Sequence, residues 1–153
     1  MTIEEMGQIF PNLTKDNTRI TSQEDYRYNC IAWAGGDSKQ WWEPSGARYH
    51  FWLHHDLAYT MESYVKVFNI LGYKEESDSS EFEKGFEKVA LYADSNGIPK
   101  HAARQLENGV WISKLGIIED IEHDTLKVLE GVDYGKVKVI LKRPRYDKSK
   151  EAT

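Results

Sequence analysis

The stretch that decides the fold is His101-Ala-Ala-Arg-Gln-Leu-Glu-Asn-Gly-Val-Trp-Ile-Ser113. Two strand-like runs, residues 101–106 and 110–113, flank the turn Glu107-Asn108-Gly109. Asn-Gly between two such runs is one of the strongest short-range signals for a β-hairpin, because both residues tolerate a positive φ. We therefore predict that these runs are adjacent antiparallel strands.

The chain on both sides of the hairpin extends this pattern. Residues 88–93 predict a further strand, and the alternating valines of residues 137–141 predict a closing one. Between them, residues 118–129 suggest a short helix. The acidic and serine-containing run 75–83 has turn formers but no apolar period, so it predicts a surface loop.

Two helices are expected before the sheet. The first begins near Asn29 and Cys30, with Asp25 or Asn29 as its cap, and ends at Gly35-Gly36. The second covers residues 60–71, where an apolar stripe follows a threonine cap. Helices followed by an antiparallel meander indicate an α+β fold, with the N-terminal helices packed on the sheet.

Length and composition predict one domain. The chain has 153 residues, of which 40% are hydrophobic, which is enough for a single core. We assign residues 1–146 to one α+β domain and residues 147–153 to a frayed C-terminal tail.

Charge and cysteine content exclude several classes of protein. A single cysteine rules out an intramolecular disulfide, and a net charge of −5 argues against a nucleic-acid binder. No signal-peptide pattern and no apolar run of about 20 residues is found, so we expect a cytoplasmic protein that does not enter membranes. The expected partner is a protein or peptide.

Cys30 stands at the first turn of the first expected helix. The free N–H groups and partial positive charge of a helix N-terminus lower the pKa of a thiol and can also receive an oxyanion. A thiolate nucleophile needs a base, and His101 is expected at the start of a strand. These positions predict a nucleophile and its base. The alternative is a plain core cysteine, because free cysteines are among the most buried residues.

The chain resembles an uncharacterised bacterial family of small proteins. The resemblance covers most of residues 20–145 and is carried by five phrases: Tyr-Asn-Cys-Ile-Ala-Trp-Ala (28–34), Gly-Phe-Glu-Lys-Val-Ala-Leu-Tyr-Ala-Asp (85–94), His-Ala-Ala-Arg-Gln-Leu (101–106), Ser-Lys-Leu-Gly (113–116) and Glu-Asp-Ile-Glu-His (119–123). This resemblance brings no activity with it.

A shorter resemblance points to the papain-like cysteine hydrolases. Tyr28-Asn29-Cys30 resembles the Tyr-Asp-Cys-Ser-Gly opening of the NlpC-type peptidases, and residues 101–113 resemble their His-Val-Gly-Ile-Tyr-Leu-Gly-Asn-Gly hairpin. Asn29 replaces the acid of that opening, and Ile31-Ala32 replaces its Ser-Gly. The resemblance implies a papain-like fold and a peptidase, amidase or deamidase that acts on an amide or thioester bond.

The same resemblance assigns roles to further residues. Cys30 would be the nucleophile, His101 the base and Ser113 the orienting group, although Glu119 or Asp120 would orient an imidazole better. Gln23 resembles the glutamine that donates to the oxyanion in papain-like enzymes; the alternative is a surface glutamine.

The aromatic segment between the two helices offers a substrate-binding wall. Trp41, Trp42 and Trp52 either line a concavity beside Cys30 or belong to the core. The histidines at positions 50, 54 and 55 lack a helix and an acidic partner motif, so we expect neither a metal nor a cofactor.

A different class of function remains open beside the hydrolase. A catalytically inactive domain with the same fold would bind a protein or small ligand, as an immunity or regulatory factor does. An exposed sulfur within reach of His101 would favour the enzyme, and a sulfur sealed in the core would favour the binding domain.

Overall fold

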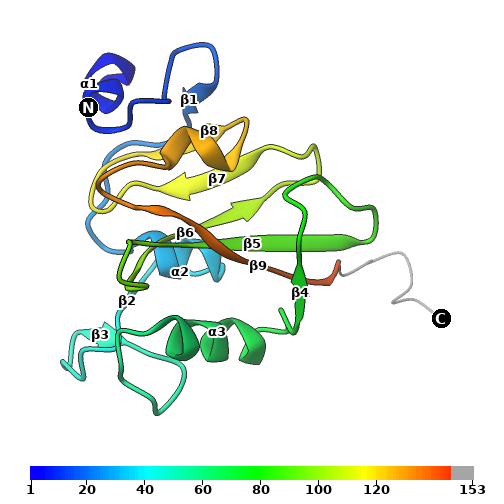
Figure 1. Cartoon of the computed structure of the whole chain (residues 1–153). Coiled ribbons are helices and arrows are strands. Elements are labelled where there is room, and N and C mark those ends of the chain that lie inside the picture. The colour runs from blue at the N-terminus through cyan, green and yellow to red at the C-terminus, as the bar shows by residue number, and fades with distance from the viewer. Residues whose placement is uncertain (146–153) are drawn as a thin grey trace, which may run out of the picture.

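The computed structural model describes residues 1–145, so the predicted tail 147–153 lies outside the described part (Figure 1). Its main element is a seven-stranded sheet in which all neighbouring strands are antiparallel. The strand order is β1-β8-β7-β6-β5-β9-β4. The strands are β1 (Thr18–Ile20), β4 (Glu75–Ser77), β5 (Phe86–Ala93), β6 (Pro99–Gln105), β7 (Trp111–Lys114), β8 (Asp120–His123) and β9 (Lys136–Pro144).

Helices are few and short. The α-helices α1 (Ile3–Ile9), α2 (Cys30–Ala34) and α3 (Met61–Ile70) have 7, 5 and 10 residues, and η1 (Leu126–Leu129) is a single 3-10 turn. The prediction of a papain-like α+β fold, with N-terminal helices packed on a sheet, is therefore wrong. The protein has a β-rich fold in which one large antiparallel sheet carries most of the regular structure.

Strand pairing explains where the prediction failed. The run 118–129, expected as a helix, forms β8 and η1, because β8 pairs with β7 on one side and with β1 on the other. The run 75–83 begins with β4, which pairs with β9 at the sheet edge. Pairing and burial in a sheet decide strand formation more than the local pattern does.

The hairpin prediction is confirmed. β6 and β7 pair in antiparallel register, with Arg104 opposite Ile112 and Gln105 opposite Trp111. Gly109 adopts a φ of 87° in the connecting turn, whereas Asn108 has no positive φ, as in a three-residue hairpin loop that ends with a left-handed glycine. β5 pairs with the other side of β6, so that Tyr92 lies opposite His101.

Both faces of the sheet are covered, and each carries its own apolar core. On one face, which we call the α2 core, Val89, Leu91 and Ala102 pack with residues of α2 and α3. On the other face, the α1 core, Ala90, Tyr92 and Ala103 pack with residues of α1 and η1. Successive side chains of a strand point to opposite faces, so the two cores share strands but not side chains.

The aromatic segment between α2 and α3 forms a two-stranded parallel ladder of β2 (Trp41–Trp42) and β3 (His50–Phe51). In Figure 1, this ladder and α3 lie at the end of the molecule opposite α1 and β1. The ladder therefore belongs to the α2 side of the sheet, where α2 contacts both β2 and β6.

A tight turn between η1 and β9 closes the structure beside β5. Gly131 and Gly135 bridge each other across this turn, and Gly135 has a φ of 72°. A Cβ atom at Gly135 would overlap the backbone carbonyl group of Ala93. Only glycine fits this position. The same turn also determines where Tyr134 lies.

We predict that Gly135→Ala destabilises the protein more than Gly85→Ala does. Gly85 also has a positive φ, of 86°, but its Cβ would meet open space. In both variants the left-handed backbone conformation costs about 1–2 kcal/mol of stability. In Gly135→Ala alone, the overlap of the new Cβ with Ala93 costs about 1–3 kcal/mol more. Urea unfolding measures the difference in free energy of unfolding. Equal losses in the two variants would contradict the close approach of Gly135 to Ala93.

Candidate functional site

Asn29 fixes the start of α2 and joins it to the aromatic ladder. Its side-chain oxygen accepts hydrogen bonds from the backbone N–H groups of Ala32 (3.1 Å) and Trp42 (3.2 Å). Its side-chain amide donates to the carbonyl of Trp42 at 2.8 Å. Asn29 is thus the cap, and Cys30 is the first residue of the helix, as the sequence predicts.

The thiol of Cys30 is buried, with 8% of the residue exposed. Burial raises the pKa of the Cys30 thiol to about 11, and the nearby backbone amides of Ala102 and Ile31 only partly oppose this effect. The sequence suggests a thiol pKa lowered by the helix N-terminus. The structure gives the opposite direction, because desolvation outweighs the field of a helix of five residues.

His101 belongs to a buried chain of polar side chains on three neighbouring strands. Its Nε2 lies 2.9 Å from Ser113 Oγ, which lies 2.8 Å from Nε2 of His123. Nδ1 of His123 lies 2.9 Å from the carbonyl oxygen of Thr125. The structure therefore brings His101 and Ser113 together and adds His123, which the sequence analysis did not select.

Aromatic rings cover His101 on the α1 side of the sheet. The ring of Tyr134 stacks on the imidazole at 4.1 Å between centroids, with an interplanar angle of 7°. Tyr92 approaches it edge-on at 5.2 Å. Both tyrosines pack in the α1 core, and His101 itself has no exposed surface.

Cys30 and His101 share no hydrogen bond within residues 1–145. Cys30 packs in the α2 core with Ala102, whereas His101, one residue earlier on β6, packs with the aromatic rings of the α1 core. Side-chain alternation along β6 turns His101 away from the Ala102 face, although Tyr134, which stacks on the imidazole, also lines the pocket of Cys30. Within residues 1–145, Nδ1 of His101 has no hydrogen-bond partner, so no hydrogen bond joins it to the thiol.

Burial also keeps both histidines of the polar chain neutral. It lowers the pKa of His123 to about 4 and holds the pKa of His101 well below its usual value, where the neighbouring His123 lowers it further. A neutral imidazole donates from one nitrogen and accepts at the other, which suits a chain that ends on a carbonyl oxygen.

The other residues proposed for the site lie elsewhere. Asp120 accepts a hydrogen bond from the Tyr28 hydroxyl at 2.9 Å, and Glu119 accepts one from the N-terminal amino group. Neither carboxylate contacts His101. Gln23 is exposed on the surface.

Trp41 and Trp42 line a pocket of about 310 Å³ that Cys30 also lines. Trp42 is 5% exposed and packs in the α2 core, and its Nε1 donates to Asp37 at 2.9 Å. Trp52 packs against the same core and donates from Nε1 to the carbonyl of Asp56 at 2.9 Å. Of the three tryptophans, Trp41 alone lines a second pocket as well.

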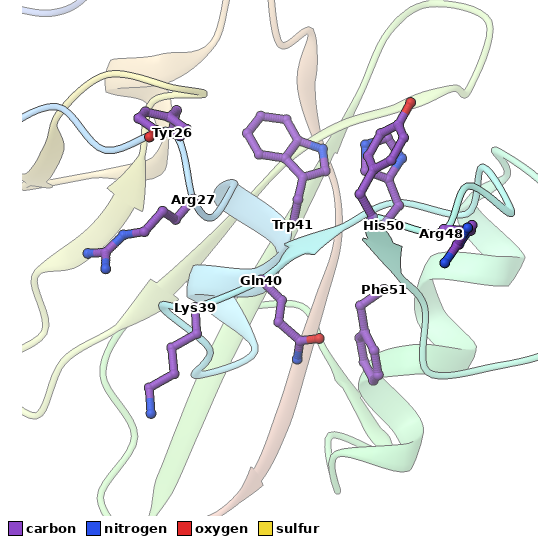
Figure 2. A pocket seen from close by; sticks show the side chains of 9 residues that line it. Tyr26, Arg27, Lys39, Gln40, Trp41, Arg48, His50 and Phe51 are labelled. Atoms are coloured by element: carbon purple, nitrogen blue, oxygen red, sulfur yellow. The ribbon is translucent and has the colours of Figure 1, made fainter.

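The second pocket has a volume of about 460 Å³ and is shown in Figure 2. We call it the aromatic-basic pocket, because aromatic rings and cationic side chains alternate around it. Its lining residues are Tyr26, Arg27, Lys39, Gln40, Trp41, Arg48, Tyr49, His50 and Phe51. Figure 2 shows Trp41 between the Tyr26–Arg27 side and the His50–Arg48 side.

The search for metal and membrane features covers residues 1–145. In this range no group of three or more His, Cys, Asp or Glu side chains is arranged to hold a metal ion. None of the helices described is both long enough and apolar enough to cross a membrane.

These observations define a β-rich domain with a buried thiol, a buried histidine–serine–histidine chain and two pockets that share Trp41. A family model described as "Domain of unknown function (DUF7689)" matches residues 19–142, and the chain belongs to this family. The comparisons with curated proteins and with solved structures gave no match. The match covers every strand of the large sheet except the first residue of β1 and the end of β9.

We predict that the free energy of unfolding falls as the pH is lowered from 7 to 5. The unfolded chain binds protons on its histidines near pH 6.5, whereas His123 stays neutral in the folded state down to about pH 4. The unfolded state therefore gains stability through this window, by about 2 kcal/mol for this one group. His101 acts in the same direction.

Urea unfolding at pH 7, 6 and 5 measures this dependence. His123→Gln is expected to flatten it, and His55→Gln, at an exposed position, to leave it unchanged. A pH dependence that is identical in the wild-type protein and His123→Gln would contradict the buried neutral imidazole.

We also predict slow alkylation of Cys30. The rate constant for iodoacetamide is expected to rise only well above pH 9, because burial stabilises the neutral thiol. His101→Gln is expected to leave the rate profile unchanged. A midpoint below the ordinary thiol value of about 8.5, moved by His101→Gln, would show a cysteine–histidine pair.

Proposed function

We propose that this chain is a catalytically inactive binding domain that recognises a protein or peptide through the pockets around Trp41. One observation carries the proposal: within residues 1–145 no hydrogen bond joins the buried thiol to the imidazole, which stacks on Tyr134 instead. A cysteine nucleophile requires a base within about 3 Å, or through one water, of the proton that it removes.

The protonation states support the same conclusion. The pKa of Cys30 is raised to about 11, and the pKa of His101 is lowered, so neither group carries charge near neutral pH. A thiolate–imidazolium pair would have the reverse shifts. In this account Cys30 is a core residue at the start of α2, and the chain from His101 to Thr125 is a structural link between β6, β7 and β8.

Trp41 is held in place for binding. Its Nε1 donates to Glu43 Oε1 at 3.0 Å, and Oε2 of the same carboxylate accepts a hydrogen bond of 2.5 Å from the Tyr59 hydroxyl. The indole also stacks with His50, at 6.4 Å between centroids. A side chain fixed before the ligand arrives loses little conformational entropy on binding, and Trp is enriched among the residues that dominate binding energy.

A hydrolase acting on an amide or thioester, with Cys30 as nucleophile, is the second candidate. It is favoured by the fact that Cys30 lines a pocket together with Trp41 and Trp42. Activity would require the thiol to become accessible and a base to reach it, and His101 would have to leave its stack with Tyr134 to do so.

Binding to a Cys30→Ala variant separates the two candidates. The ¹⁵N-labelled protein is titrated with a randomised decapeptide mixture, and the indole N–H of Trp41 is followed by NMR. The binding domain predicts equal shift changes in the wild-type protein and Cys30→Ala, with no peptide cleaved or attached. Peptide products or a covalent adduct that disappear in Cys30→Ala would support the hydrolase instead.

We predict different outcomes for two neighbouring tryptophans. Trp42→Ala empties a buried site in the α2 core and is expected to cost about 3–5 kcal/mol of stability. Trp41→Ala removes a partly exposed ring and is expected to lower the melting temperature less, while abolishing the NMR response of the neighbouring residues to peptide. Thermal melts and peptide titration on both variants check this. Equal melting losses would place Trp41 in the core and remove it as a binding residue.

A further inference from the structure

The geometry points to an acidic peptide segment as the ligand of the aromatic-basic pocket. This inference rests on the proposed binding function and adds the chemical class of the partner. Three cationic side chains, Arg27, Lys39 and Arg48, line the pocket, and none of its nine lining residues is acidic. The chain as a whole has a net charge of −5, so this is a local reversal of sign.

The carboxylates next to the pocket are already engaged by other groups. Asp37 accepts hydrogen bonds from the backbone N–H of Lys39 (2.7 Å), from Gln40 Nε2 (2.9 Å) and from Trp42 Nε1 (2.9 Å). Asp25 pairs with Arg27, at 2.7 Å from the guanidinium. Asp37 therefore fixes the loop that carries Lys39 by accepting hydrogen bonds from uncharged donors. The ammonium group of Lys39 remains available for a ligand.

Lys39 and Arg48 are the two cations available to a partner. Both are exposed, and within residues 1–145 neither forms an ion pair. Each approaches the pocket from a different side of Trp41, one from the segment before β2 and the other from the segment before β3 (Figure 2). A ligand that neutralises both would have to carry acidic groups at separated positions, as an extended peptide does.

The aromatic residues fit a peptide better than a nucleotide. Tyr26 and Tyr49 are each 80% exposed, and Tyr49 packs edge-on against His50 at 4.6 Å. Trp41 and His50 are paired across the β2–β3 ladder, with ring centroids 6.4 Å apart and an interplanar angle of 26°. Phosphate sites usually offer backbone N–H groups from a glycine-rich loop, whereas the cations here stand on long side chains. Exposed Tyr, Trp and Arg are the residues enriched where proteins bind proteins.

Three fluorescein-labelled decapeptide mixtures test the inference. The acidic mixture carries Asp or Glu at two central positions, the amide mixture Asn or Gln, and the basic mixture Lys or Arg. All other positions are randomised equally in the three mixtures. Fluorescence anisotropy is measured with Cys30→Ala, so that no turnover affects the signal. We expect the acidic mixture to bind at least tenfold more tightly than the amide mixture, and its affinity to fall with added salt.

Charge reversal in the pocket provides the matched control. Lys39→Glu/Arg48→Glu is expected to weaken binding of the acidic mixture at least tenfold, while Lys15→Glu/Lys84→Glu, with the same change in net charge at exposed lysines outside the pocket, changes it less than twofold. Equal responses of the two double variants would overturn the inference, as would binding of AMP but of no acidic peptide.

The two proposals fail in different ways. If the amide mixture binds as tightly as the acidic one, and Trp41→Ala abolishes both, the acidic class is wrong and the binding function stands. If no mixture shifts the Trp41 indole signal, the pocket is not a peptide site and both proposals fall.

Discussion

Side-chain alternation along β6 is the constraint on which the rest of the structure depends. Ala102 is a small residue that lets α2 pack closely on the sheet, and His101 beside it must then face the other core. The pairing of β6 with β7 and of β7 with β8 fixes this direction, because a slip of one residue would turn every side chain to the opposite face. Cys30 packs on the Ala102 face of β6, and the His101 side chain points to the other face, where Tyr134, which stacks on it, also lines the pocket of Cys30.

The same packing shapes the surface around Trp41 that we propose as the binding site. Asn29 caps α2 and bonds to both the N–H and the carbonyl of Trp42, so the helix start and the aromatic ladder form one unit. Trp42 is buried by this arrangement, and its neighbour Trp41 is turned outward between two pockets. The buried Cys30 at that helix start packs in the α2 core, and the surface beside it is the one proposed to bind a partner.

Local signals in the sequence predicted local structure well and long-range arrangement poorly. The caps Asn29 and Thr60 predicted the helices α2 and α3, and the Asn108-Gly109 turn predicted the hairpin. These signals worked because caps and turns depend on nearby residues alone. The capping box of Thr2 and Glu5 is a local signal of the same kind for α1. Strands β1 and β8 depend on each other across about 100 residues, and no local pattern reveals that pairing. The pair of Cys30 and His101 was inferred from helix-start and strand-start positions. The face of the strand that the histidine occupies depends on the register of the sheet. Helix-start and strand-start positions carry no information about that register.

The state of the imidazoles tests the central claim most directly. The ring ¹⁵N signals of His101 and His123 are measured by NMR from pH 5 to pH 8, in the wild-type protein and in Cys30→Ala. The account predicts neutral rings in both proteins above pH 6, each with one protonated and one unprotonated nitrogen, and the same His101 signals whether or not the thiol is present. A His101 imidazolium at pH 7 that disappears in Cys30→Ala would show a thiolate–imidazolium pair and would contradict two neutral groups that share no hydrogen bond.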